Sequence, residues 1–344
     1  MTTRSGGGRA FIAGCAGLRL SAEERAFFRD ADPWGLILFR RNVADPGQVG
    51  ALTAAFRDCV GRADAPVFID QEGGRVQRLV PPHWPRYPAG RAYGLASPKD
   101  PERRRALAWL GARLIASDLR KVGVTVDCLP VLDVPAPGSH SIIGDRAYGD
   151  EPAIVAELGR AAAEGLMAGG VLPVVKHIPG HGRANLDSHE ALPRVAASLA
   201  ELRRRDFPPF RALADMPLAM TAHIVFEAID PERPATTSPI VIADTIRGEL
   251  GFGGLLMSDD VSMKALSGGF RERAEASFRA GCDIALHCNG KMDEMRAVAE
   301  VAPALAGNAL RRAEAALARI AREPEPFDAV EARAELDAAL ALVA

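Results

Sequence analysis

The sequence predicts a (β/α)8 barrel, a closed ring of parallel strands in which each strand is followed by a helix. Short and almost continuously apolar segments recur along the chain, as is typical of parallel strands that are covered by helices. Amphipathic helical segments separate these runs. Eight strand-then-helix units fit this barrel, and the chain has no GxGxxG turn that would favour an open doubly wound sheet.

The strand candidates share an apolar composition and short length. We expect them to form one domain over residues 1–344, with the barrel over about 10–305 and a helical cover over about 306–344. The cover consists of Met292–Arg322, with a break at Pro303, and Ala329–Val343, both expected on the outside of the barrel. The strand candidates are Ala10–Ala13, Trp34–Phe39, Pro66–Asp70, Val124–Leu132, Val171–Lys176, Pro217–His223, Gly254–Asp259 and Cys282–His287.

Several helix ends carry recognisable signals. Ser21–Glu24 and Ser198–Glu201 have the S-x-x-E pattern of a capping box, in which the serine and glutamate side chains satisfy backbone N–H groups. Asp45–Pro46 places a capping residue before a proline suited to the first turn. Leucines repeat near one face of Arg103–Lys121, and Gly123 lies where the C-terminal stop of that helix is expected.

Composition excludes several classes of protein. The 344 residues are 48% hydrophobic and 25% charged, as in ordinary globular domains, and the net charge is −2. This charge and the scattered arginines argue against nucleic acid or an anionic membrane as a partner. No apolar run approaches the ~20 residues of a membrane span, and the first residues lack a signal-peptide core. Five cysteines without a CxxC motif fit free thiols. We therefore expect a cytoplasmic protein.

Ionisable residues end most of the strand candidates, at the positions where barrels of this type build their active sites. A charge that is desolvated without a partner costs free energy, so packing alone does not explain this pattern. The residues concerned are Asp70, Asp133, Lys176, His177, His223, Asp259 and His287.

Four sequence blocks resemble glycoside hydrolase family 3. They occur in the family's order between Trp34 and Asn289, and they are IDQEGGRVQRL, LPVLDV with IIGDRAYGD, KHIPGHG with DSH, and LLMSDDVSM. The third block is similar to that of the single-domain bacterial β-N-acetylglucosaminidases. In the family, this block distinguishes the β-N-acetylglucosaminidase branch from the β-glucosidase branch. Two departures are visible, because Ile178 replaces the usual Phe and Arg183-Ala184 stand where many members carry Asp-Thr.

Cleavage of a glycosidic bond with retention requires a carboxylate nucleophile on one face of the sugar and a proton donor on the other. The resemblance implies that the nucleophile is Asp259; its neighbour Asp260 should point the opposite way, since strand side chains alternate. The resemblance also implies His189 as acid/base and Asp187 as the residue that orients it, which suits a proton shuttle near neutral pH. The alternatives are that Asp259 caps the next helix and that His189 is an exposed loop residue.

The resemblance further implies a set of sugar-binding residues. Carboxylates accept hydrogen bonds from sugar hydroxyls, and cationic side chains donate to hydroxyl oxygens. The two arginines of the set could instead be internal ion-pair partners of Asp70 or Asp145, and His223 could support Asp259 without touching the sugar. The set is Asp70, Arg78, Arg146, Lys176, His177 and His223.

A metal site is not expected. His177 and His181 are four residues apart, as on a zinc-binding helix, but Pro179-Gly180 lies between them and disfavours a helix. No Glu occupies the position that the zinc motif requires. His181 is interpreted as a brace of its loop and Asp133 as structural. We expect no cofactor and no metal.

The resemblance implies a monomeric retaining β-N-acetylglucosaminidase with a small carbohydrate as its partner. Its substrate would be a muropeptide of the GlcNAc–1,6-anhydro-MurNAc type in peptidoglycan recycling, cleaved by double displacement. Three alternatives remain open. One is a β-glucosidase or xylosidase of the same family, and another is a phosphorylase, because a histidine does not repel incoming phosphate as a carboxylate does. The third, from a different class, is a non-catalytic sugar-binding barrel.

Overall fold

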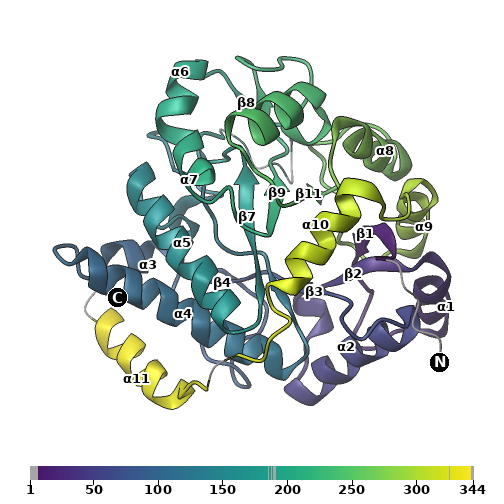
Figure 1. The fold of residues 1–344 in the computed structure, drawn as a ribbon, viewed down its shortest axis with the longest axis horizontal. Helices are drawn as coiled ribbons and strands as arrows, with labels where there is room; N and C mark the ends of the chain where they lie inside the picture. Colours follow the sequence, from purple (N-terminus) through teal and green to yellow (C-terminus); the bar gives the residue numbers. More distant parts are fainter. Residues whose placement is uncertain (1–6, 185, 187, 189–190, 325, 342–344) are drawn as a thin grey trace.

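Eight parallel strands form a closed barrel in the computed structural model, which describes residues 7–184, 186, 188, 191–324 and 326–341. Helices surround the ring (Figure 1), and the predicted (β/α)8 barrel is confirmed. The barrel strands are β1 (Arg9–Ala13), β2 (Pro33–Leu38), β3 (Val67–Ile69), β6 (Val126–Asp127), β7 (Leu172–Ile178), β9 (Leu218–Thr221), β11 (Leu255–Asp260) and β12 (Ile284–His287). Their spatial order is β1-β12-β11-β9-β7-β6-β3-β2.

The fourth strand of the barrel, β6, is much shorter than the apolar run that predicted it. The predicted segment Val124–Leu132 contributes only β6 to the ladder, followed by one isolated bridge between Val131 and Lys176. Pro130 lies between the two and has no N–H to donate to a ladder. Hydrophobic patterning located this strand, and the proline shortened it.

Two small sheets lie outside the barrel. The antiparallel hairpin of β4 (Gln71–Gly73) and β5 (Val76–Gln77) follows β3, and β8 (Arg194–Val195) pairs in parallel with β10 (Val225–Phe226). The hairpin β4–β5 extends from the carboxyl end of β3. It therefore contributes side chains to the same end of the barrel as the strand termini.

The helices begin and end close to the predicted signals. Both capping boxes form, at Ser21–Glu24 and Ser198–Glu201, and Asp45 caps the second helix through the N–H of Gln48. The α-helices are α1 (Ala22–Ala31), α2 (Pro46–Val60), α3 (Gly90–Leu95), α4 (Pro101–Lys121), α5 (Pro152–Ala168), α6 (Leu199–Glu201), α7 (Phe207–Ala212), α8 (Phe270–Ala280), α9 (Met292–Val301), α10 (Gly307–Ala318) and α11 (Ala329–Leu340). Shorter 3-10 and π-helical segments are η1 (Arg40–Asn42), η2 (Gly144–Arg146), η3 (Leu202–Asp206), η4 (Ala235–Thr237) and η5 (Val241–Glu249).

One apolar cluster fills the inside of the barrel. Large side chains such as Trp34 and Phe68 meet edge to face at 5.7 Å between ring centroids, and both are almost completely buried. Burial of each large apolar side chain contributes roughly 1.5–3 kcal/mol. The interior is thus a packed core and not an open channel.

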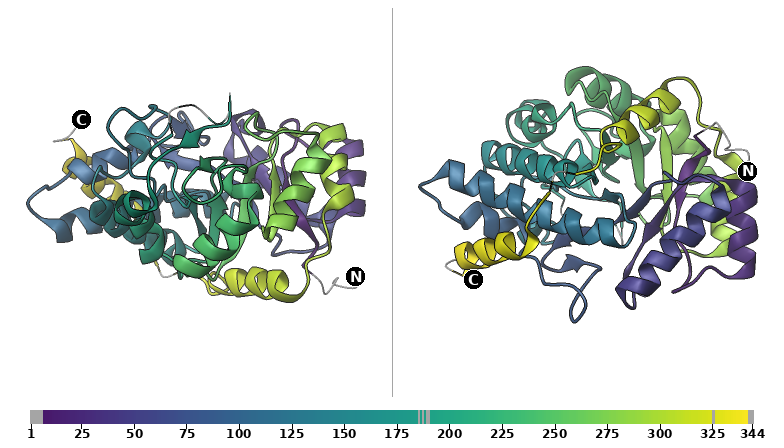
Figure 2. Two further views of the ribbon diagram at one scale, coloured as in Figure 1. Left: turned by 90° about the horizontal axis from the view of Figure 1, so that it is seen from above. Right: turned by 60° about the horizontal axis from the view of Figure 1, so that its bottom comes forward.

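Helix α10 closes the amino-terminal end of this core. Leu305, Ala313 and Ala316 belong to the same cluster as the barrel interior, and Ala10 donates its N–H to the carbonyl of Pro303. Figures 1 and 2 show α10 across one end of the barrel and α11 along its side next to α4. Both helices thus lie outside the strand ring, α10 over its amino-terminal end and α11 on its side. The break at Pro303 is confirmed, because α9 ends before it.

No helix in the described part of the chain has the length and apolar character needed to cross a membrane.

Candidate active site

A pocket of about 180 Å³ opens at the carboxyl ends of the barrel strands. The β4–β5 hairpin, the 3-10 segment η2 and the strands β7 and β11 supply most of its charged lining. Six residues that the sequence analysis assigned to the site line this pocket, and they are Asp70, Arg78, Arg146, Lys176, His177 and Asp259. Asp70 and Asp259 are 189 positions apart in the sequence, and the fold brings both to the same small pocket.

Lys176 is the centre of the charged network that lines the pocket. Its side chain is 2% exposed, and its Nζ lies 2.9 Å from Oδ1 of Asp70 and 2.6 Å from Oε1 of Glu72. Burial acts to lower the pKa of Lys176, but the charges of Asp70 and Glu72 outweigh it and raise the pKa above its usual value. The ammonium group therefore stays charged at neutral pH, with two carboxylates holding it in place.

Two arginines complete this network. Arg146 makes two hydrogen bonds of 2.8 Å to the carboxylate of Glu72, and Arg78 lies 3.1 Å from Oδ2 of Asp70. Burial acts to raise the pKa of Glu72, but Arg146 and Lys176 hold it at about 2. Arg78 thus makes the ion pair with Asp70 that the sequence left as an alternative. Arg146 pairs with Glu72 and not with Asp70 or Asp145, and both arginines still line the pocket.

Glu72 is a site residue that the sequence reasoning missed. It follows Asp70 by two residues, and both side chains reach the same lysine. Residues i and i+2 of an extended segment lie on one face, so this spacing was a usable signal within IDQEGG.

His177 is held by a buried aspartate. Asp133 accepts a hydrogen bond from Nδ1 of His177 at 2.7 Å, and its other oxygen accepts the backbone N–H groups of His177 and His181. Burial acts to raise the pKa of Asp133, but the neighbouring histidines and these hydrogen bonds lower it. Asp133 thus holds the ring of His177 and the backbone at the start of the loop that follows β7.

Asp259 and Asp260 end β11, and both have atoms in the pocket lining. The carboxylate of Asp260 is engaged with the protein, because it accepts hydrogen bonds from the N–H and Oγ of Ser262 and from the N–H of Cys288. Asp259 accepts the N–H of Asp260 at 2.8 Å. The expectation that only one of the pair faces the pocket is therefore wrong, because both residues line it.

His223 lies beneath the pocket and is not among its lining residues. Its ring is fully buried, with Nδ1 2.7 Å from Oγ1 of Thr236 and Nε2 3.0 Å from the backbone oxygen of Asp260. Burial lowers the pKa of His223, so a neutral ring makes these bonds. This placement matches the supporting alternative for His223 and not the sugar-binding one.

Asp187 and His189 lie outside the described residues. The loop that leads to them contributes His181 and Ser188 to the pocket lining, with Nε2 of His181 3.2 Å from the Oγ of Ser188. Burial and the charge of His177 lower the pKa of His181 to about 4. Gly182 passes so close to Val134 that a Cβ would lie 2.0 Å from its carbonyl oxygen, which requires glycine.

Arg183, one of the two departures from the resembled pattern, forms an ion pair with Asp206. The Nε of Arg183 lies 2.7 Å from Oδ2 of Asp206, which is buried at the end of η3. Burial raises the pKa of Asp206 in spite of this partner. The departure therefore attaches the stem of the loop to the helical layer.

Among the described residues, no three or more His, Cys, Asp or Glu side chains are grouped so that they could hold a metal ion.

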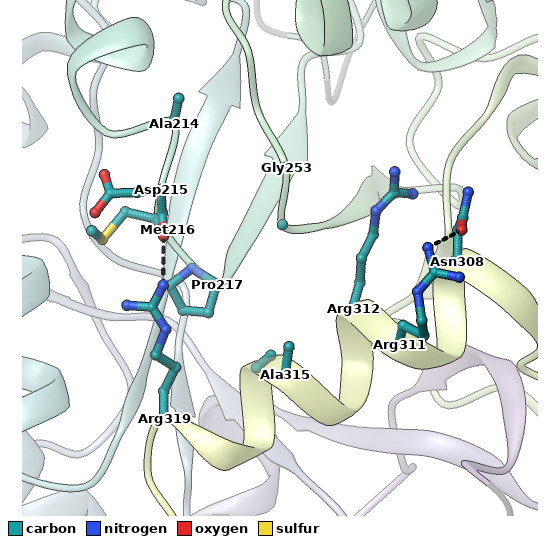
Figure 3. Close-up of a pocket in the computed structure, with 12 residues that line it drawn as sticks. Ala214, Asp215, Met216, Pro217, Gly253, Asn308, Arg311, Arg312, Ala315 and Arg319 are labelled. Carbon is teal, nitrogen blue, oxygen red and sulfur yellow. Dashed lines mark hydrogen bonds between the residues drawn. The ribbon is translucent and has the colours of Figure 1, made fainter.

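A second hollow, of about 470 Å³, lies at the amino-terminal end of the barrel between α10 and the loops before β9 and β11 (Figure 3). Arg312 is paired there with Asp283, and Arg319 donates to the carbonyl of Asp215. Sites in this fold are built at the carboxyl ends of the strands, and the convergent ionisable groups are at that end. The smaller pocket is therefore the candidate active site.

Comparison with known proteins agrees with the barrel and its charged pocket. Residues 11–322 match the model of the glycosyl hydrolase family 3 N terminal domain. The chain is 41% identical over 280 residues to a β-hexosaminidase of Alkalilimnicola ehrlichii, covering 80% of this chain and 79% of that protein. It is 40% identical over 286 residues to a β-hexosaminidase of Pseudomonas aeruginosa, covering 82% and 83%.

Solved structures give the same result. The crystal structure of NagZ from Neisseria gonorrhoeae in complex with N-trifluoroacetyl-D-glucosamine has a TM-score of 0.84 and 34% identity, covering 98% of this chain and 97% of that one. A family 3 β-N-acetylglucosaminidase from Paenibacillus sp. has a TM-score of 0.78 and 34% identity, covering 100% and 64%. Fold, pocket and relatives together define a glycoside hydrolase. The chain belongs to glycosyl hydrolase family 3, and within it to the β-hexosaminidase type.

Proposed function

We propose that this chain is a retaining β-N-acetylglucosaminidase that removes a terminal GlcNAc residue, with residues 1–344 acting as one catalytic domain. The observation that carries the proposal is Asp259, a carboxylate at the end of β11 that lines a pocket with an ordered cationic and anionic wall. The volume of about 180 Å³ is below the roughly 300–1,000 Å³ of pockets for drug-sized ligands. Such a space suits one sugar residue.

Sugar hydroxyls would bind to charged groups that are already held in position. The Asp70–Lys176 and Glu72–Arg146 pairs keep donors and acceptors in fixed places before a substrate arrives. Hydrogen bonds from ionised groups are stronger than neutral ones, and preorganised groups lose little entropy on binding. Asp70, Arg78, Arg146, Lys176 and His177 are therefore proposed to orient the sugar ring.

The proposed chemistry is a double displacement. Asp259 attacks the anomeric carbon while His189, oriented by Asp187, transfers its proton to the leaving oxygen, which departs as the aglycone hydroxyl. His189 then takes a proton from water as the water oxygen attacks the same carbon, and the bond to Asp259 breaks. The roles of Asp187 and His189 rest on the family resemblance, because both residues lie outside the described part of the chain.

The sugar specificity is supported by the relatives. Those in the curated set are named β-hexosaminidases, and the N. gonorrhoeae structure contains an N-acylated glucosamine. We propose the same amino sugar for this chain. We also propose a muropeptide aglycone, a role in peptidoglycan recycling and a monomeric state, which the family resemblance supports. The proposed cytoplasmic location is supported by the free cysteines.

A turnover assay tests this function. The purified chain should release 4-nitrophenol from 4-nitrophenyl N-acetyl-β-glucosaminide and much less from the corresponding glucoside and xyloside. Equal or faster release from the glucoside would replace the proposal with the β-glucosidase alternative. Binding of the amino sugar with no cleavage of any aryl glycoside would indicate a sugar-binding barrel.

A further inference from the structure

Asp127 is a buried carboxyl group beneath the pocket that the proposed chemistry does not use. It ends β6, is 0% exposed and lies in register with Ile69 of β3 and Pro173 of β7. It is not among the pocket-lining residues. A fully buried acid in the barrel wall is costly unless its surroundings favour it, so its contacts need an explanation.

A hydrogen bond of the Asp127 side chain leads to the residues proposed to bind the sugar. Oδ1 of Asp127 accepts the backbone N–H of Gln71 at 2.9 Å. The side-chain oxygen of Gln71 in turn accepts the N–H groups of Arg78 and Leu79, both at 3.0 Å. The guanidinium of Arg78 then pairs with Asp70. Asp127 is thus the inner end of a hydrogen-bonded chain that reaches the pocket wall in two steps.

The second oxygen of Asp127 is in a setting that disfavours negative charge. Among the described residues, Oδ2 has no hydrogen-bond partner. The charged and titratable groups around it come from four places in the chain. They are Asp70 and Glu72 from the β3–β4 segment, Lys176 from β7, Cys128 next in the chain, and Tyr148 after η2.

Lys176, the cation of this group, already donates to Asp70 and Glu72. Burial raises the pKa of Asp127 to about 8; the charges of Asp70 and Glu72 add to this, and the Gln71 N–H and Lys176 oppose it. A carboxylate with one donor for its two oxygens would be poorly solvated, so the uncharged acid is the favoured form at neutral pH.

We propose that Asp127 is a positioning residue of the sugar pocket. In its uncharged form it holds the Gln71 backbone and, through Gln71, the segment that carries Arg78. The inference rests on the proposed sugar-binding function of Asp70, Arg78 and Lys176. Ionisation of Asp127 would place a third carboxylate next to the single lysine that Asp70 and Glu72 share. This would draw Lys176 away from the pocket wall and weaken sugar binding.

Replacement of Asp127 by Ala and by Asn tests the hydrogen bond and the charge separately. Asp127→Ala leaves the Gln71 N–H buried without an acceptor and should raise KM for the aryl N-acetylglucosaminide by about tenfold, with a smaller change in kcat. Asp127→Asn keeps an acceptor without charge and should restore KM to within about twofold of the wild type near pH 7. A tenfold loss in Asp127→Asn would show that the charge is needed. Wild-type KM in Asp127→Ala, or a loss confined to kcat, would also overturn the proposal.

The pH profile provides a second readout, which remains usable if Asp127→Ala does not fold. Wild-type KM should rise as the pH passes about 8, because Asp127 ionises there, and KM of Asp127→Asn should not. Identical alkaline limbs in the two proteins would contradict the assignment.

A third readout does not depend on turnover. The folded-state pKa of Asp127 lies above its usual value of 3.8, so its stabilising contribution is complete below that value and is lost as the pH rises through about 8. The thermal midpoint of Asp127→Asn minus that of the wild type should therefore increase over this pH interval and stay constant above it. A constant difference would refute the uncharged acid. If the wild type hydrolyses no aryl N-acetylglucosaminide, the proposed function is wrong. The stability comparison still determines whether Asp127 is uncharged in the folded protein.

Discussion

The Nζ of Lys176 lies 2.6 Å from Oε1 of Glu72, and the two side chains are 2% and 3% exposed. This ion pair joins a barrel strand to the hairpin that follows β3, at the end of the barrel where the pocket opens. Breaking a buried pair leaves an uncompensated charge, whose cost exceeds the value of the contact itself. The pair therefore couples the stability of the fold to the shape of the sugar pocket.

Lys176→Met should destabilise the protein by roughly 3–5 kcal/mol, because Asp70 and Glu72 lose their shared buried cation. Chemical denaturation measures this change. The matched control is Lys121→Met, which removes a lysine that is 64% exposed and should change the stability little. Equal effects of the two substitutions would contradict the structural role of the network.

Glu72→Gln tests whether the residue that the sequence reasoning missed belongs to the site. The amide keeps the shape of the side chain but removes the charge that Lys176 and Arg146 share. We expect kcat/KM for the aryl N-acetylglucosaminide to fall by about tenfold or more. Exposed Glu102→Gln, on α4, is the control, and steady-state kinetics is the measurement. Wild-type kinetics in Glu72→Gln would remove Glu72 from the site.

The stability of the protein should fall as the pH drops from about 6.5 to about 4, in part because of His181. Its folded-state pKa is depressed, so the unfolded chain takes up a proton in this interval that the folded chain does not. The stabilising contribution is complete above the usual pKa and decreases toward the lower value. Thermal unfolding of the wild type and of His181→Asn across this range measures it. If both proteins lose the same stability, the histidine is not the responsible group.

His189→Ala should affect substrates according to their leaving groups. An activated aryl glycoside needs little proton donation, whereas an alkyl or sugar aglycone needs a full proton transfer to its oxygen. We therefore expect a much larger loss of kcat/KM for a disaccharide substrate than for the 4-nitrophenyl glycoside. Equal losses on both substrates would argue against His189 as the acid. His83→Ala, a histidine outside the pocket, serves as the control.

The strands and the ends of several helices could be predicted because their signals are local. Continuous apolar runs mark covered parallel strands, and the capping patterns at Ser21 and Ser198 specify where helices begin. The site residues at strand ends, such as Lys176 and Asp259, followed from the same reading, since this fold collects the ends of its strands at one place.

The remaining features depend on contacts between distant segments. The apolar face of α10 carries Ala313 and Ala316, which do not specify whether a helix covers the side or the end of a barrel. His223 ends a predicted strand, but only its bonds to Thr236 and Asp260 show that it supports the site from below. Asp127 lies inside an apolar run, and the pattern of a buried strand does not indicate which groups its carboxyl contacts.

Trapping of the glycosyl-enzyme intermediate is the most direct test of whether Asp259 forms a covalent bond to the sugar. A fluorinated N-acetylglucosaminide analogue slows breakdown of the glycosyl-enzyme more than its formation, so the adduct can be digested and located by peptide mass spectrometry. We expect a single label on Asp259 and no label in Asp259→Ala. A label on Asp260 or on any other residue would contradict it.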